Sequence, residues 1–437
     1  MVHISALLTF PLLGFLSLVQ SFPTPENIAR LNISPDELHE ALLEIRDKRL
    51  LFDTGKPVDV SGDHVFKAPN FDAGDQRGPC VGLNALANHG YLPRDGIANV
   101  VQIISAANQA VLGMGIDIAT LVAAIGTVFV GNPLSLSPGF SIDGKSSKAS
   151  NVLGNLFGVL GTPRGLSASH NIIEADGSFT RDDLYVTGDA ATMNMSLFLD
   201  TYYSIGEGGL SFDQVGARIA KRVGESVATN PNFYSGPYTG MIGRNGGYAF
   251  GSRLLSNHSS EQSEGVLSKE VFKSFWGVYD SPTSPSGLAY RRGHEQIPAN
   301  WYRIPQDYTL VQLNLDLVKW YLTHPMTLSM GGNMGKVNSF VGIDLSDLTG
   351  GVLNANTILE GNGLMCFLLE VVKLGAPNSL GTLFKTLAEP LEMITDALAE
   401  PLLNLQCPEF GDLQSGGTNL WAKLMNYPGA KKAGMAF

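Results

Sequence analysis

Cys80 is the residue of this 437-residue chain whose surroundings most clearly indicate chemistry. Pro79 precedes it, and the residues from Val81 onward have the composition of a short helix that Gly90 can end. Cys80 is therefore expected at the amino end of a helix, where free backbone N–H groups and the helix dipole favour a thiolate. Such a thiolate can be a nucleophile, a metal ligand or the axial ligand of a haem iron. The alternative is a buried, inert cysteine.

A second group of residues could hold a cation. Glu174 and Ser178 lie four positions apart, so in a tight turn or at a helix start both oxygens can meet one hard cation. The backbone carbonyl of Ala175 could supply a third oxygen. The alternative is a solvated acidic turn, and the residues by themselves leave both interpretations open.

The run Gly78 to Pro93 reads Gly-Pro-Cys-Val-Gly-Leu-Asn-Ala-Leu-Ala-Asn-His-Gly-Tyr-Leu-Pro. It resembles the proximal segment of the fungal haem-thiolate peroxidases, the family of chloroperoxidase and the unspecific peroxygenases, which usually have Pro-Cys-Pro where this chain has Pro-Cys-Val. The resemblance extends in patches over residues 70–410, including 228–233 and 333–339. It implies that Cys80 is the axial ligand of the iron of haem b.

The family also carries a Glu-x-Asp-x-Ser motif that binds magnesium or manganese beside a haem propionate. The segment Glu174-Ala175-Asp176-Gly177-Ser178 is similar to it. The resemblance therefore implies a Mg or Mn ion held by Glu174, Ala175 and Ser178, which would neutralise propionate charge and fix the orientation of the haem.

Three features depart from the family. Val81 brings a backbone N–H near the sulfur that proline lacks, and such an N–H withdraws electron density from the thiolate. A peroxidase also needs a base to move a proton between the oxygens of peroxide. The family has a Glu where this chain has Gly246, and residues 233–248 contain no acid. The pocket phenylalanines of the family have no evident counterpart either. Catalytic candidates, each of which could instead have a surface or packing role, are Arg244, Tyr248, Tyr238, His170 and Glu261.

The resemblance implies a function, and alternatives stay open. The first hypothesis is a peroxidase or peroxygenase that uses hydrogen peroxide to oxidise, oxygenate or halogenate a small organic substrate, in fungal secondary metabolism. The second is a haem-binding family member with little peroxidase turnover. The third is a secreted binding protein that has lost catalysis. The net charge of −11 argues against nucleic acid as a partner.

The amino-terminal residues predict secretion. The apolar run Ile4–Leu18, followed by small residues, is typical of a signal peptide over residues 1–21. A second apolar stretch, Ile116–Val130, is too short to span a membrane, so no transmembrane segment is expected. Asn-x-Ser sequences predict glycosylation at Asn32, Asn194 and Asn257.

Three cysteines are an odd number for a secreted protein. The resemblance implies a disulfide between Cys366 and Cys407, which leaves Cys80 free for iron. Residues 22–69 are expected to form an N-terminal extension, residues 70–410 the haem domain and residues 411–437 a C-terminal tail. Helical periodicity dominates and strands are scarce, so the fold class is all-α. One amphipathic run, 212–227, is expected to carry Arg218, Lys221 and Arg222 on its polar face.

Overall fold

A computed structural model describes residues 55–151, 162–343, 358, 360–379, 388–408, 413–415 and 417–436. The predicted signal peptide and Asn32 lie outside these residues. Most of the described elements are helices: α4 Val81–Asn88, α5 Val100–Ile104, α6 Ile116–Val130, α7 Leu184–Thr187, α8 Met195–Ser204, α9 Phe212–Thr229, α10 Asn245–Ala249, α11 Lys269–Phe275, α12 Leu310–Thr323, α13 Gly363–Ser379, α14 Ala388–Asn404, α15 Leu420–Leu424 and α16 Pro428–Ala433.

The strands are short and form four small antiparallel sheets among the described residues. The pairs are β1–β2, β4–β5 and β8–β9, and the three-stranded sheet has the order β3-β6-β7. Their bounds are β1 Ile97–Asn99, β2 Gly139–Ser141, β3 Tyr234–Ser235, β4 Val278–Asp280, β5 Leu288–Tyr290, β6 Gly331–Asn333, β7 Phe340–Gly342, β8 Gln414–Ser415 and β9 Thr418–Asn419. The predicted mainly helical fold is thus confirmed.

Two of the longest helices have sequences that explain their form. Helix α6 is apolar around most of its circumference and nearly every residue in it is buried, as expected of a helix in a protein core. Helix α9 is amphipathic and begins with a capping box, in which Ser211 and Gln214 each bond the other's backbone N–H. No described helix combines the length and apolar character that a membrane crossing requires.

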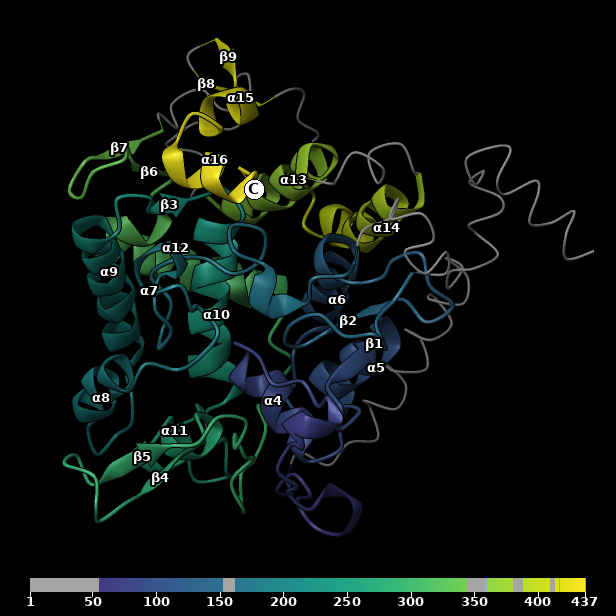
Figure 1. Cartoon of the computed structure of the whole chain (residues 1–437), viewed down its shortest axis with the longest axis vertical. Coiled ribbons are helices and arrows are strands. Elements are labelled where there is room, and N and C mark those ends of the chain that lie inside the picture. The colour runs from purple at the N-terminus through teal and green to yellow at the C-terminus, as the bar shows by residue number, and fades with distance from the viewer. Residues whose placement is uncertain are drawn as a thin grey trace, which may run out of the picture.

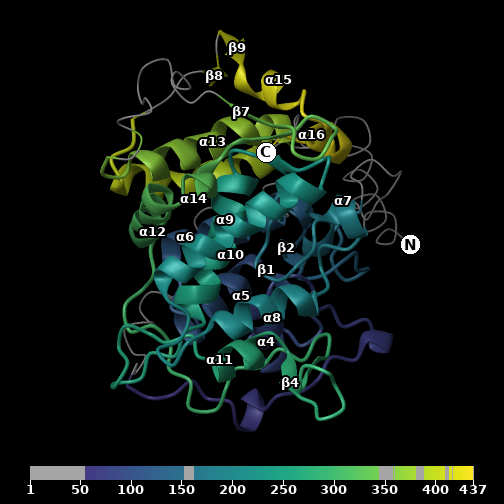
Figure 2. The same cartoon turned by 90° about the vertical axis from the view of Figure 1, so that its left-hand side faces the viewer.

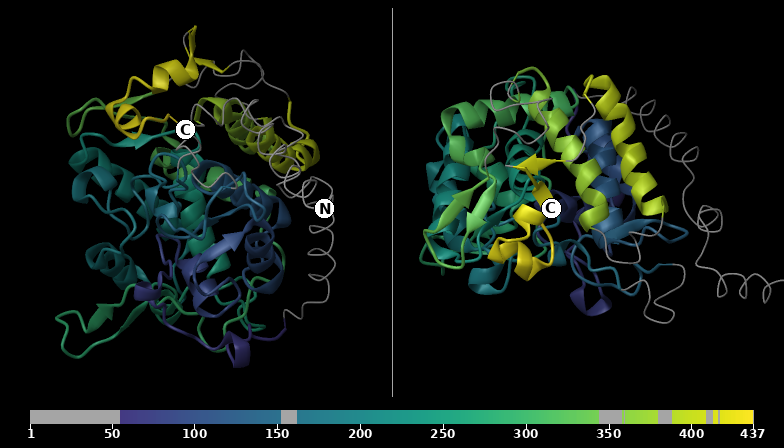
Figure 3. Two further views of the ribbon diagram at one scale, coloured as in Figure 1. Left: turned by 45° about the vertical axis from the view of Figure 1, so that its right-hand side comes forward. Right: turned by 90° about the horizontal axis from the view of Figure 1, so that it is seen from above.

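The helices pack around a helical stretch over residues 239–254, the central element, which contains α10. Helices α9 and α12 contact α10 from one side, and α4, α5 and α6 lie across from it (Figure 1). Helix α14 packs along both α6 and α13, and the three run beside one another when seen from above (Figure 3, right). Helices α8 and α11 close the opposite end of the molecule (Figure 2). Buried apolar side chains from all these helices belong to one hydrophobic core.

The central element was missed by sequence reasoning. Residues Thr239–Arg244, Asn245–Ala249 and Phe250–Leu254 form one continuous helical stretch with π-type turns at both ends, designated η6, α10 and η7. Its many glycines oppose helix formation by propensity, so packing against α9 and α12 must stabilise it. Turns of the π type inside helices often occur at functional sites.

Two smaller expectations need correction. Arg218 and Arg222 are buried, while Lys221 alone of the three basic residues of α9 is well exposed. The sequence pattern predicts a helix over residues 269–278, whereas α11 ends at Phe275 and Val278 begins strand β4. Helices α15 and α16 lie within residues 411–437, and α16 packs on β3 and β6. The sequence also predicts a helix over residues 34–51, which lie outside the described residues.

Candidate functional site

Cys80 is the N-cap residue of α4, as its sequence context predicted. Helix α4 runs Val81–Asn88, and Gly90 adopts the left-handed conformation just beyond it, with φ of 71°. The loop before the cysteine is held close to strand β2: a Cβ at Gly78 would lie 2.1 Å from the carbonyl oxygen of Ile142. Only glycine allows this approach, so Gly78 fixes the path of the chain into Cys80.

Asn84 fastens the same loop from within the helix. Its Oδ1 accepts from the N–H of Gly78 at 3.0 Å, and its Nδ2 donates to the carbonyl of Gly78 at 2.9 Å. The Nδ2 group also donates to Glu295 Oε1 at 3.0 Å. Sequence reasoning did not assign roles to either residue. Asn84 lies within the recognised motif, but nothing in the sequence connects Glu295 to a loop more than 200 positions away.

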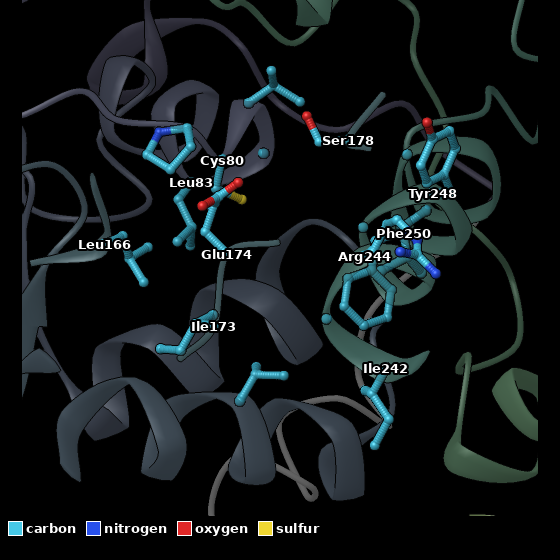
Figure 4. Close-up of a pocket in the computed structure, with 18 of the residues that line it drawn as sticks. Cys80, Leu83, Leu166, Ile173, Glu174, Ser178, Ile242, Arg244, Tyr248 and Phe250 are labelled. Atoms are coloured by element: carbon cyan, nitrogen blue, oxygen red, sulfur yellow. The ribbon is translucent and has the colours of Figure 1, made fainter. Parts of the chain in front are cut away.

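Cys80 opens into a cavity of about 330 Å³. Most of the wall is apolar, with contributions from α4, α6, the segment around Glu174 and the central element. Figure 4 shows Cys80 and Leu83 on one side and Ile242 and Phe250 on the other. A concave, mostly apolar pocket with a few polar groups is the usual form of a cofactor or ligand site.

The surroundings of Cys80 have opposing effects on the pKa of its thiol. The side chain has an exposed surface, but that surface faces the cavity, and burial raises the pKa of the thiol. The N–H groups of Gly82 and Leu83 and the charge of Arg181 lower the pKa. The N–H of Val81, which the sequence placed near the sulfur, is not among these groups, and Cys80 makes no side-chain capping hydrogen bond. A metal cation in the cavity would complete the stabilisation of the thiolate.

Glu174 lines the same cavity and points into it (Figure 4). His170 Nδ1 lies 2.6 Å from Glu174 Oε2, whereas Oε1 is buried and has no hydrogen-bond partner among the described residues. Burial opposes the charge of the imidazole, but Glu174 and Asp176 outweigh it and raise the pKa of His170 to about 9. One carboxylate oxygen is thus occupied by a protonated histidine, and the other is left for a ligand.

The other predicted cation ligands share the cavity. Ala175 and Ser178 line it together with Glu174, and their role as cation ligands stays a prediction. The Ser178 hydroxyl accepts from the N–H of Arg181 at 3.1 Å, which fixes the turn. Asp176 points away into the protein, where its Oδ2 accepts from Asn230 Nδ2 at 2.9 Å, and burial raises its pKa well above the usual value.

The described residues contain no group of three or more His, Cys, Asp or Glu side chains suited to a metal ion. The candidate cation site is of another kind, because it would use one carboxylate, one hydroxyl and one backbone carbonyl. Such oxygen donors are the ligands that Mg²⁺ accepts.

Arg244 and Tyr248, the catalytic candidates, both line the cavity. The guanidinium of Arg244 donates to Ser235 Oγ at 3.3 Å and to the Thr327 carbonyl at 3.2 Å, and burial lowers its pKa to about 10. The Tyr248 hydroxyl donates to the carbonyl of Gly177 at 3.0 Å. Both polar ends are therefore engaged by protein, so neither is free to serve as a base.

The remaining catalytic candidates differ in whether they reach the cavity. Tyr238 lines the cavity, His170 lies behind Glu174, and Glu261 is exposed and does not reach the cavity. Among the described lining residues Glu174 is the sole carboxylate. Gly247, and not Gly246, faces the cavity from the central element, and a Cβ there would have nothing within 4 Å. No distal acid is found among the described residues of the wall.

Aromatic side chains do line the cavity, contrary to the expectation from sequence. Phe179 and Trp276 stand at one end of the wall, with ring centroids 5.7 Å apart, and Phe250 projects from the central element. They were missed because they come from segments other than the one that precedes Glu174.

The disulfide between Cys366 and Cys407 is present, with the Cα atoms 5.2 Å apart, and Cys80 is free as predicted. The two predicted glycosylation sites within the described residues stay predictions. Asn194 is the N-cap of α8 and its Nδ2 donates to Asp182, while Asn257 Oδ1 accepts from the N–H of Tyr302.

Known proteins resemble this chain over most of its length. The family model described as "Peroxidase, family 2" matches residues 64–306. An aromatic peroxidase of Fusarium equiseti is 52% identical over 396 residues, which is 90% of each chain. A dothistromin biosynthesis peroxidase of Dothistroma septosporum is 37% identical, over 90% of this chain and 92% of its own.

An aromatic peroxygenase of Cyclocybe aegerita is more distant, at 27% identity over 76% of this chain and 81% of its own. The geometry of the site is consistent with these matches. Both segments that carry the sequence resemblance reach one cavity: Pro79 to Leu83 line it from the cysteine motif, and Glu174, Ala175 and Ser178 line it from the acidic motif. The chain belongs to peroxidase family 2, the haem-thiolate peroxidases, and is a peroxidase.

Proposed function

We propose that this peroxidase is secreted, holds haem b through Cys80, and uses hydrogen peroxide to oxidise, oxygenate or halogenate a small aromatic substrate in fungal secondary metabolism. The observation that carries the proposal is the placement of Cys80 at the amino end of α4, open to an apolar cavity. The names of the relatives, aromatic peroxidase and dothistromin biosynthesis peroxidase, support the substrate class and the biosynthetic context. The sequence of residues 1–21 supports secretion.

The residues present fit a haem. Its iron requires a soft anionic ligand, which Cys80 supplies, and its porphyrin requires apolar surroundings, which the wall supplies. Its propionates are stabilised by cationic partners. The unpartnered Glu174 Oε1 would fit a Mg or Mn ion, because a buried carboxylate oxygen without a partner is costly unless a cation or donor reaches it.

When bound, haem supplies the iron at which peroxide is activated and the substrate oxidised. The chain contributes the thiolate and the N–H groups of Gly82 and Leu83 that act on its sulfur. Asn84 fixes the loop through Gly78, so that the sulfur is held in place before any ligand binds. Leu83, Ile242 and Phe250 exclude water from the cavity. Glu174, Ala175 and Ser178 would hold the cation that orients the haem.

One observation favours a second candidate function, that of a haem protein with little peroxidase turnover. Glu174 is the sole carboxylate among the described lining residues, and the central element offers glycine where an acid would be needed. Without a positioned base, proton transfer within peroxide is slow.

A spectrum and one assay distinguish these functions. In the reduced, CO-treated protein, thiolate-bound haem gives a band at about 450 nm. We expect this band together with peroxide-dependent oxidation of a phenol or aryl alcohol. The band without turnover would favour the second candidate, and absence of the band would overturn the haem-thiolate assignment. The Cys80→Ala variant is the control for both readings.

A further inference from the structure

The cavity contains a buried cation that the proposed chemistry does not use. Arg181 lines the wall beside Cys80, and 5% of its surface is exposed. Its Nη2 donates to the carbonyl of Pro79 at 3.2 Å, which places the guanidinium against the cysteine loop. Its Nε and Nη1 groups are buried and have no hydrogen-bond partner among the described residues.

An unpaired guanidinium in such a place is costly. Burial lowers the pKa of Arg181, and the smaller opposing effects come from Tyr290, Glu295, Cys80 and Asp189. None of the described carboxylates forms an ion pair with it, since Glu295 uses one oxygen for Asn84 and leaves the other without a partner. A buried charge without an ion-pair partner is destabilising, so the fold retains this arginine at a cost.

Comparison with two other buried arginines, Arg244 in the cavity wall and Arg77 in the cysteine loop, shows what is unusual here. Arg244 has one unpartnered nitrogen and donates to Ser235 and Thr327. Arg77, which lies three positions before Cys80 and outside the cavity wall, donates through all three of its nitrogens. Arg181 thus differs in combining a cavity position with two free donors. A charged guanidinium with unpartnered N–H donors is a strong hydrogen-bond partner for a carboxylate.

We propose that Arg181 is a carboxylate-binding residue of the cavity, which positions the group bound there through a donor that the protein leaves unpartnered, Nε or Nη1. The carboxylate has two possible sources, a haem propionate or an acidic group on the organic substrate. A haem propionate agrees with charge balance. Haem b has two propionates, and a cation at Glu174 would neutralise the charge of one of them, which leaves the other for Arg181. The inference rests on the proposed haem site.

Haem release from the full-length, haem-loaded protein tests the first source. The rate of haem transfer to apomyoglobin is compared in the wild type and in Arg181→Gln, with haem and with haem dimethyl ester, whose propionates are neutral. We expect Arg181→Gln to release haem roughly 10- to 100-fold faster, the range for a lost hydrogen bond to a charged group, and to release the ester at nearly the wild-type rate. Arg77→Gln is the matched control and should affect both porphyrins equally.

Titration of the haem-loaded proteins with 4-methoxybenzoate and with 4-methoxybenzyl alcohol, followed by the Soret band, tests the second source. A tenfold or greater loss of affinity for the benzoate alone, with haem release unchanged, assigns the carboxylate to the substrate. Equal effects of Arg181→Gln on acid and ester, or no effect in either assay, would overturn the proposal. If Arg181→Gln does not fold, Arg181→Lys gives the same comparison, with a smaller factor of about 3 or more because the guanidinium donors are lost and the charge is kept. A wild-type protein without the band at about 450 nm would instead refute the proposed haem site.

Discussion

His170 Nδ1 lies 2.6 Å from Oε2 of Glu174, and the pairing leaves Oε1 of the same carboxylate without a partner at the cavity. This asymmetry indicates how one acidic motif can serve both the fold and a ligand. His170 fixes the rotamer of Glu174 from the protein side. The free oxygen can then bind a cation without first breaking an internal hydrogen bond.

The cation site predicts different effects for two neighbouring acids. Glu174→Gln removes the negative charge at the cavity, so haem release should become about tenfold faster. Asp176→Asn changes a residue that bonds Asn230 away from the cavity, so it should lower thermal stability and leave haem release near the wild-type rate. The measurements are haem transfer to apomyoglobin and thermal melting.

Removal of the metal provides the control for this comparison. Treatment with EDTA should accelerate haem release from the wild type and have no further effect on Glu174→Gln. Equal haem retention and equal metal content in the two variants would remove the cation site from consideration.

The cysteine assignment predicts a spectrum. Cys80→Ala should abolish the band at about 450 nm in the reduced CO complex, together with any peroxide-dependent activity, because no other described lining residue offers a thiolate. The double variant Cys366→Ala, Cys407→Ala should keep the band. Persistence of the band at about 450 nm in Cys80→Ala would refute Cys80 as the iron ligand.

The disulfide predicts a change in stability without a change in chemistry. It joins residues 41 positions apart and connects α13 to the segment after α14. On the chain-entropy estimate, the double alanine variant should lose about 4 kcal/mol of unfolding free energy. Chemical denaturation measures this loss. A loss of the thiolate spectrum in that variant at temperatures where it remains folded would contradict the prediction.

Much of the site could be predicted from sequence because its parts are local. The cysteine and its helix follow each other directly, and Glu174, Ala175 and Ser178 share one turn, so a contiguous pattern describes each of them. The boundaries of α6, Ile116–Val130, also agree with its apolar stretch. These features depend on propensity and short spacing, which a single sequence displays.

The features that the sequence did not predict depend on tertiary contacts. The central element is rich in glycine and is helical only because its neighbours pack on it, which overrides propensity. Arg222 reads as a surface residue by periodicity, yet its Nε donates to the carbonyl of Ser178 at 3.1 Å and supports the acidic turn. Glu295 and Arg181 reach the cysteine loop from distant segments, so no local pattern could assign them there.

The absence of a distal acid predicts slow reaction with peroxide. Gly247 faces the cavity and has open space where a Cβ would stand, so a carboxylate introduced there would enter the cavity. Positioned bases typically contribute about 10²–10⁴-fold, so Gly247→Glu should raise the rate of peroxide reaction toward that range while leaving the CO spectrum unchanged. Stopped-flow spectroscopy of the haem-loaded protein measures the rate.

Two controls separate acid–base chemistry from a change of shape. Gly247→Gln has the same size as Gly247→Glu but cannot act as a base at neutral pH, so it should not accelerate the reaction. Gly246→Glu tests the position at which the sequence resemblance predicts the family's Glu. A Cβ there lies 3.8 Å from the ring of Phe250, and the residue does not line the cavity, so its gain should be smaller. A wild-type protein that already reacts at the rate of a good peroxidase would refute the missing-base argument. Glu174, the carboxylate that faces the cavity, would then be the first residue to replace.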